Sequence, residues 1–246
     1  MRIGVWSKKP LAALLALAVV ACGGETPAAD PQRTTSGDNA NANPSISAPV
    51  PVEGPERRVI AFGDSLFAGY NVAPEDSYPA KLQDALRENG VNALVVNAGI
   101  SGDTSAAGRQ RLAFTLDAQE ERPDLFILEL GGNDLLRGIE PDETRANFVA
   151  MLDELRSREI PVLIMGMRAP PNYGPEYTQE FDALYGDLAR EYGAAYIPFW
   201  LEEIYQEPQL FQDDRIHPTE EGIERLVAAT VERVQAAIPD KMTAKE

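Results

Sequence analysis

The chain of 246 residues contains one histidine, His217, in the segment DDRIHP at residues 213–218. An imidazole exchanges a proton near neutral pH, so a histidine beside an acid is a candidate general base. Asp214 stands three residues earlier, a spacing at which one turn lets its carboxylate hold Nδ1 while Nε2 faces a reacting group. Asp213 is the weaker partner, because adjacent carboxylates cannot both reach the same nitrogen. A single histidine in a loop is also commonly structural, so the other residues of the site must show whether His217 is catalytic.

Three further polar segments contain the groups that acyl transfer requires: FGDSLFAGY with Ser65, NAGISGDTS with Gly102, and ELGGNDLLRG with Asn133 and Asp134. A serine hydroxyl attacks a carbonyl only when a base takes its proton. The resulting oxyanion needs two or more donors, for which the candidates are the backbone N–H groups of Ser65 and Gly102 and the Asn133 amide. Each segment alone is weak, because such residues also serve turns and caps. We interpret Asp64 and Asp134 as scaffolding of their loops.

Strands and helices alternate along the part of the chain that must position these residues. Hydrophobic patterning predicts strands at 58–62, 91–99, 124–130, 161–167 and 194–198, and helices at 77–90, 104–119, 142–158, 176–193 and 219–238. This alternation predicts a three-layer α/β fold with a parallel sheet. Ligands of such sheets bind beyond the carboxyl ends of the strands, where three of the four polar segments begin.

GDSL at 63–66, SGDT at 101–104, GGND at 131–134 and DRIH at 214–217 together resemble the sequence blocks of the GDSL, or SGNH, hydrolases. With PPNYG at 170–174, the wider segments are similar to the bacterial periplasmic thioesterase I, lysophospholipase and arylesterase branch. The resemblance implies an α/β/α sandwich with a flavodoxin-like, five-stranded parallel sheet. It also implies a serine esterase that cleaves acyl esters and thioesters through an acyl-enzyme.

The same resemblance implies a role for each matched position. Ser65 is the expected nucleophile, and its N–H with Gly102 and Asn133 forms the expected oxyanion hole. His217 is the expected base and then acid, with Asp214 as its partner.

Three more residues are expected to bind the substrate. Leu135 and Leu136, in LLRG, resemble a mobile loop of the family that covers the acyl chain. Tyr173 lies in the Pro- and Tyr-rich segment that follows the fourth predicted strand, and we expect it to line the acyl or leaving-group side of the cleft.

The first 22 residues differ from the rest of the chain. Basic residues precede the apolar run LAALLALAVVA, which ends at Cys22, the only cysteine. The run is too short for a mature transmembrane helix but is typical of a secretory signal. LAVVAC resembles the lipobox of bacterial lipoproteins, in which the cysteine is lipidated and becomes the mature N-terminus. Cleavage at residues 16–18 is the alternative. In the lipoprotein resemblance, Gly23 in place of Asp favours an outer-membrane anchor facing the periplasm.

The predicted organisation is therefore a signal at 1–22, a disordered tether at 23–57, a hydrolase domain at 58–238 and a tail at 239–246. The formal net charge of −17 repels phosphate backbones, which makes nucleic acid an unsuitable partner. The expected partners are an acyl ester substrate and a membrane reached through the lipid on Cys22. The oligomeric state is left open.

We expect no metal and no cofactor. One histidine and one cysteine cannot build a ligand set, and GGND lacks the Lys-Ser/Thr of a phosphate loop. Two other functions remain open: an O-deacetylase of envelope polysaccharide that uses the same residues, and a non-catalytic envelope lipoprotein that binds lipid or a partner.

Overall fold

The computed structural model describes residues 52–240, so the expectations for Cys22, the signal, the tether before residue 52 and the tail after residue 240 lie outside the described residues. One sheet contains β1 (Arg57–Gly63), β2 (Ala93–Gly99), β3 (Leu125–Glu129), β4 (Val162–Met165) and β5 (Ala195–Ile197). All neighbouring strands are parallel, in the order β2-β1-β3-β4-β5. The predicted flavodoxin-like sheet is confirmed.

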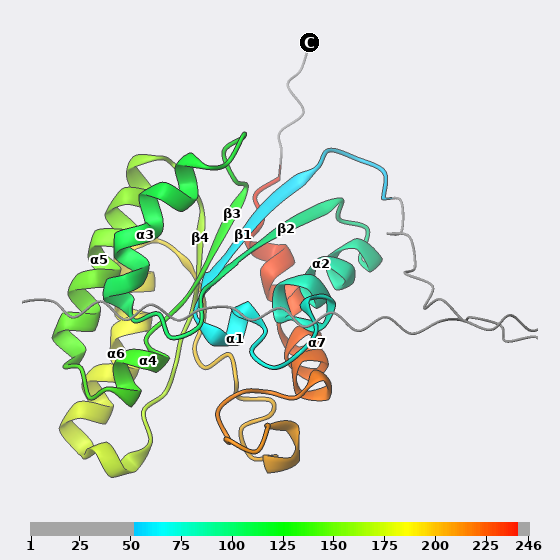
Figure 1. Cartoon of the computed structure of the whole chain (residues 1–246). Coiled ribbons are helices and arrows are strands. Elements are labelled where there is room, and N and C mark those ends of the chain that lie inside the picture. The colour runs from blue at the N-terminus through cyan, green and yellow to red at the C-terminus, as the bar shows by residue number, and fades with distance from the viewer. Residues whose placement is uncertain (1–51, 241–246) are drawn as a thin grey trace, which may run out of the picture. The chain divides into compact units, whose positions relative to one another are not determined.

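Helices cover both faces of this sheet (Figure 1). The longer helices are α2 (Tyr78–Glu88), α3 (Ser105–Asp117), α5 (Pro141–Ser157), α6 (Pro175–Tyr192) and α7 (Glu220–Ala237). Helices α2 and α7 pack together on one face, and α3, α5 and α6 pack on the other. The three-layer α/β/α architecture is therefore as predicted. Among residues 52–240, no helix is long and apolar enough to span a bilayer.

The central strand β3 shows why the sheet has two covered faces. Its five residues, LFILE, are all buried. Leu125 and Ile127 join the core under α2 and α7, whereas Phe126 and Leu128 join the core under α3, α5 and α6. Side chains alternate between faces along a strand, so an apolar run of this length needs a helix layer on each side.

The structure differs from the predicted elements mainly at short segments. Arg57 belongs to β1 rather than to the tether: its N–H donates to the Asn92 carbonyl at 2.8 Å, and its guanidinium lies 3.7 Å from Asp124. The short helices α1 (Ser65–Ala68) and α4 (Gly132–Leu136) were not among the predicted elements. Both are single turns after a strand, too short for a hydrophobic period to show. Three 3₁₀ turns, at Pro74–Asp76, Pro171–Tyr173 and Pro208–Leu210, complete the described chain.

Candidate active site

Ser65 is the first residue of α1, immediately after β1. The turn depends on Asp64, whose Oδ1 accepts a hydrogen bond from the Leu66 N–H at 3.0 Å and caps the short helix. It also depends on Gly63, because a Cβ there would lie 2.6 Å from the Glu129 carboxylate and 2.9 Å from the Glu129 carbonyl. The close approach of β1 and β3 thus requires glycine, and the chain leaves β1 with Ser65 at the carboxyl edge of the sheet.

His217 joins Ser65 to Asp214. Its Nε2 lies 2.8 Å from Ser65 Oγ, and its Nδ1 lies 2.7 Å from Asp214 Oδ2. Asp214 Oδ1 also accepts the backbone N–H groups of Ile216 at 2.9 Å and His217 at 3.0 Å. Burial tends to raise the pKa of Asp214, but the hydrogen bonds from His217 and these two backbone groups outweigh it and lower that pKa. The imidazole is therefore oriented by an ionised carboxylate and placed to take the serine proton.

Asp213 and Tyr70 differ in their relation to the imidazole of His217. Asp213 has no hydrogen bond to the imidazole, and Asp214 alone contacts Nδ1 among the described residues. Tyr70 stacks on the imidazole, with ring centroids 4.2 Å apart. The sequence reasoning missed Tyr70, although it ends the GDSLFAGY segment. Its spacing from Ser65 carries no signal of a contact with residue 217.

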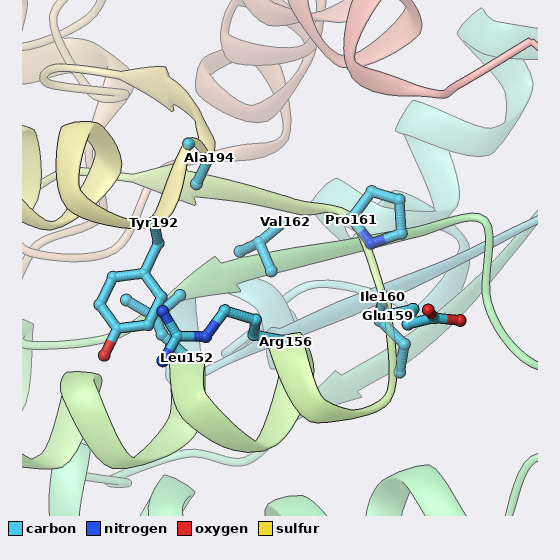
Figure 2. Close-up of a pocket in the computed structure, with 9 residues that line it drawn as sticks. Leu152, Arg156, Glu159, Ile160, Pro161, Val162, Tyr192 and Ala194 are labelled. Atoms are coloured by element: carbon cyan, nitrogen blue, oxygen red, sulfur yellow. The ribbon is translucent and has the colours of Figure 1, made fainter.

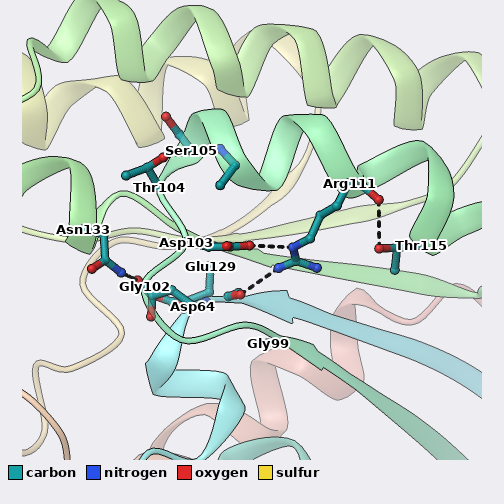
Figure 3. A network of polar contacts seen from close by, with 12 residues as sticks. Asp64, Gly99, Gly102, Asp103, Thr104, Ser105, Arg111, Thr115, Glu129 and Asn133 are labelled. Atoms are coloured by element: carbon teal, nitrogen blue, oxygen red, sulfur yellow. Dashed lines mark hydrogen bonds and ion pairs between the residues drawn. The ribbon is translucent and has the colours of Figure 1, made fainter. Parts of the chain in front are cut away.

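The two other expected oxyanion donors lie on the loops that follow β2 and β3. Asn133 Nδ2 donates to Asp64 Oδ2 at 3.0 Å (Figure 3), so the buried Asp64, which directly precedes Ser65 in the chain, orients the amide. Gly102 has a φ of +87°, a left-handed backbone that glycine adopts without strain. Its carbonyl accepts from the Arg137 guanidinium at 2.8 Å. Asn133 and Ser65 line the same cleft.

A buried acidic pair lies behind the nucleophile. The Asp64 N–H donates to Glu129 Oε2 at 3.3 Å, and both side chains are almost completely buried. Burial raises the pKa of Asp64 to about 6, although hydrogen bonds from Leu66 and Asn133 act in the opposite direction. Burial, and next the charge of Asp64, raise the pKa of Glu129 well above its ordinary range. The sequence reasoning missed Glu129, whose only signal is an acid at the end of an apolar strand.

Asp134 has a different role from Asn133 beside it. Its carboxylate is fully buried and accepts from the Ser105 N–H at 2.7 Å, from the Ser105 hydroxyl, and from the Thr144 hydroxyl at 3.1 Å. These contacts tie α4 to α3 and α5. Asp134 thus holds the loop in place, as expected from the sequence.

A cleft of about 570 Å³ opens beside Ser65 and His217. Its lining is largely apolar and includes Leu66, Leu135, Leu136, Met167, Phe199, Leu201 and Phe211. Leu135 is 6% exposed and Leu136 is 56% exposed, so the first forms the wall and the second the rim.

Tyr173 is not among the residues that line this cleft, and its expected contact with the substrate stays a prediction. Its hydroxyl donates to the Leu135 carbonyl at 2.9 Å, and its ring packs 5.2 Å from that of Tyr177. Tyr173 therefore supports the backbone of Leu135.

No group of three or more potential metal-ligating side chains occurs within residues 52–240. The polar groups of the site instead pair with one another: Asp214 with His217, His217 with Ser65, and Asp64 with Asn133.

Residues 61–225 match the GDSL-like Lipase/Acylhydrolase family, and the chain belongs to that family. It is 40% identical over 164 residues to "Thioesterase 1/protease 1/lysophospholipase L1" of Escherichia coli (strain K12), covering 67% of this chain and 76% of the relative. It is 40% identical over 165 residues to "Arylesterase" of Vibrio mimicus, covering 67% and 82% of the two chains.

A solved structure agrees with these relatives. The crystal structure of AlinE4, a SGNH-hydrolase family esterase, is 54% identical, with a TM-score of 0.65, and the match covers 76% of this chain and 100% of that one. The resemblance inferred from the sequence blocks is confirmed, and the protein is a serine ester hydrolase.

Proposed function

We propose that this esterase hydrolyses acyl esters, and thioesters, of medium to long chain through an acyl-enzyme on Ser65. The observation that carries the proposal is the continuous hydrogen-bonded chain Asp214–His217–Ser65, which ends at the mouth of an apolar cleft of about 570 Å³. A cleft of this size and lining suits a hydrocarbon chain.

The geometry supports the following steps. Ser65 Oγ attacks the acyl carbonyl carbon while His217 Nε2 takes the hydroxyl proton. The oxyanion accepts hydrogen bonds from the Ser65 and Gly102 N–H groups and from the Asn133 amide. As the tetrahedral intermediate collapses, His217 returns the proton to the departing alcohol or thiol. Water then attacks the acyl-enzyme with His217 again as base, which releases the acid and restores Ser65.

The substrate classes are supported by the relatives and by the cleft. The names of the relatives include thioesterase, lysophospholipase and arylesterase activities. Leu135, Leu136 and Phe199 offer apolar contacts to an acyl chain on the cleft wall and rim. We therefore propose acyl esters and thioesters as the substrates, ahead of acetylated envelope polysaccharide.

Hydrolysis of p-nitrophenyl acyl esters by the purified protein tests the proposal. Ser65→Ala and His217→Ala should each lower kcat by about 10³-fold or more, because each removes a group on which the whole mechanism depends. Asp214→Asn should lower kcat by at least about 10²-fold. Asp213→Asn is the matched control and should stay within about twofold, because Asp213 has no contact with the imidazole. Wild-type rates in Ser65→Ala or His217→Ala would refute the mechanism.

An acyl-chain series with the same leaving group separates the substrate classes. Activity that rises toward octanoyl or longer esters agrees with the apolar cleft. Activity confined to acetate would instead favour an O-deacetylase of envelope polysaccharide. Absence of labelling by a fluorophosphonate would favour a non-catalytic lipoprotein.

The rate should also depend on pH. Only the neutral imidazole of His217 accepts the serine proton, so kcat/KM should fall in acid, where the imidazole is protonated. A flat profile from pH 5 to 8 would contradict the assignment of His217 as the base.

We further propose that Cys22 carries a lipid that anchors the protein in the bacterial envelope, facing the periplasm, with the outer membrane favoured. The support is the basic, apolar and LAVVAC segments in sequence, followed by Gly23. Incorporation of a labelled fatty acid in cells tests this proposal. Cys22→Ser should abolish the label and release the protein from the membrane fraction, and unchanged fractionation would refute the anchor.

A further inference from the structure

The loop that contains Gly102 is held by two arginines from different helices. We infer that Arg111 and Arg137 are positioning residues that keep the Gly102 N–H aimed at the oxyanion. The inference rests on the role proposed above for Gly102, and it assigns to these arginines an effect on the rate of the chemical step rather than on substrate binding.

Arg111, on α3, connects the Gly102 loop to the nucleophile turn (Figure 3). Its Nε donates to Asp103 Oδ2 at 2.6 Å, and Asp103 directly follows Gly102. A terminal nitrogen of the same guanidinium donates to the Gly63 carbonyl at 2.9 Å, two residues before Ser65. The guanidinium also lies 3.7 Å from the centroid of the Phe62 ring. One rigid fork therefore fixes the distance between the two loops.

Arg137, at the end of α4, connects the Gly102 loop to the helix that contains Asn133. Its guanidinium donates to the Gly102 carbonyl at 2.8 Å. Its backbone N–H donates to the carbonyls of Asn133 at 3.1 Å and Asp134 at 3.2 Å. The segments that contain the three proposed oxyanion donors are thus connected through two arginine residues, by both guanidinium groups and by the backbone N–H of Arg137.

Gly102 needs such support because of its own backbone. Its φ of +87° lies in a region that glycine leaves readily, since no Cβ restricts it. A Cβ at this position would have only Arg137 within 4 Å, at 3.8 Å, so packing against Gly102 itself does not hold the peptide. An oxyanion donor accelerates the reaction only if its direction is fixed before the charge develops. The Asp103 N–H donates to the Ile100 carbonyl at 3.2 Å and closes the turn around Gly102, and the two arginine contacts fix that turn against the neighbouring loops.

A purely structural role is the alternative, since the Arg111–Asp103 ion pair is mostly buried, with side-chain exposures of 16% and 13%. In that alternative, loss of the ion pair would lower the free energy of unfolding and leave kcat unchanged. Two observations favour a positioning role. Each arginine donates to a main-chain carbonyl beside the active site, Arg111 to that of Gly63 and Arg137 to that of Gly102. The two arginines also contact adjacent residues of one loop, Asp103 and Gly102, from two different helices.

The test uses conservative variants that keep the charge. Arg111→Lys cannot bridge Asp103 and Gly63 with one ammonium, so kcat should fall about 10- to 100-fold while KM stays within about threefold. Arg137→Lys should lower kcat about 3- to 10-fold, because its side chain is more exposed. The double variant should lose less than the product of the two effects, since both constrain one peptide.

A second readout separates positioning from stability. An alkyl boronic acid forms a tetrahedral adduct with a catalytic serine and resembles the oxyanion. Its Ki should rise in proportion to the loss of kcat/KM in both variants. Arg158→Lys is the matched control: Arg158 pairs with Asp117 at 2.6 Å at the far end of the same helix α3, and its activity and boronate Ki should stay within about twofold.

Three results would overturn the inference: wild-type kcat in Arg111→Lys, a loss expressed in KM alone, or an unchanged boronate Ki. If Arg111→Lys fails to fold, Asp103→Asn weakens the same contact and should show the same kcat loss at unchanged KM. Failure of the proposed function is recognised separately, because Ser65→Ala would then keep activity whatever the arginine variants do.

Discussion

The sheet has a hollow at each of two opposite edges, the one formed by the carboxyl ends of its strands and the one formed by their amino ends. The two hollows differ in how their polar groups are arranged. The cleft at the carboxyl ends measures about 570 Å³ and contains Ser65 and His217. The hollow at the amino ends of β4 and β5 measures about 260 Å³ (Figure 2). There Arg156 pairs with Asp153 at 2.7 Å and lies 4.8 Å from the Tyr192 ring centroid. These are solvated surface contacts.

The comparison shows that a concave shape alone does not define a site. At the amino ends Arg156 is exposed and pairs with the exposed Asp153 on the same helix, α5. At the carboxyl ends, two buried acids with raised pKa values, Asp64 and Glu129, lie directly behind the serine. β1 lies between β2 and β3, so the chain leaves β1 and β2 toward opposite sides of the sheet and opens a crevice there. Functional sites commonly combine such burial with perturbed titration.

Among the residues that surround Ser65 and His217, the largest expected effect follows removal of the Asn133 amide. Asn133→Ala should lower kcat about 10²- to 10³-fold with a small change in KM, because the donor acts mainly on the charged transition state. Steady-state kinetics with a p-nitrophenyl ester measures this effect. A loss expressed as a higher KM at unchanged kcat would show that Asn133 binds substrate instead.

The next expected effect is on stability, because burial of the Asp64 carboxyl makes the free energy of unfolding depend on pH. Folding raises its pKa from 3.8 to about 6, so the folded state holds the proton more readily between those values. The carboxyl therefore lowers the free energy of unfolding as pH rises from about 4 to 7. Asp64→Asn removes this term and should gain stability relative to wild type as the pH rises over that interval. Denaturant unfolding at several pH values measures the gain.

The same variant should lose activity. The Leu66 N–H donates to Oδ1 of Asp64 and the Asn133 amide donates to Oδ2. An asparagine has an acceptor at only one of these two positions, so one of the bonds is lost and kcat should fall about tenfold or more. Asp182→Asn is the control: burial also raises the pKa of Asp182, which accepts from the Ala169 N–H outside the cleft lining. It should shift stability with pH but leave kcat within about twofold. Full activity in Asp64→Asn would contradict the proposed orientation of Asn133.

A smaller effect is expected at the rim of the cleft. Leu136 is 56% exposed, so Leu136→Ala should cost little stability. It should lower kcat/KM for octanoyl or longer esters about three- to tenfold, corresponding to one apolar contact of about 1 kcal/mol, and leave acetyl esters unchanged. An equal loss across the acyl-chain series would show that Leu136 acts on the chemistry rather than on the chain.

The smallest effect is expected at the amino ends. Arg156→Ala removes a surface ion pair with Asp153 and a contact with Tyr192, which together contribute no more than about 1 kcal/mol. Activity should stay within about twofold. A large activity loss on any ester would give this hollow a functional role and end the contrast between the two edges.

The residue pattern alone was sufficient for the fold class and for the polar blocks of the site. Strand-like apolar runs alternating with amphipathic helices lead to a parallel sheet, because each apolar run needs cover on both faces. The chemistry of serine, histidine and aspartate, together with the order of the segments, led to Ser65, Asp214 and His217. Local spacing also separated Asp214 from Asp213, since the Asp214–His217 contact spans three residues.

Contacts between distant segments were decided only by the tertiary structure. Glu129 lies beside Asp64, and Arg111 bridges Asp103 and Gly63, because β1, β2 and β3 end at the same edge. Tyr173, in the turn that precedes α6, donates to the Leu135 carbonyl of α4, 38 residues away in the chain. No period or spacing encodes such contacts. They depend on which loops the folded sheet brings together, and burial among those loops gives Asp64 its raised pKa.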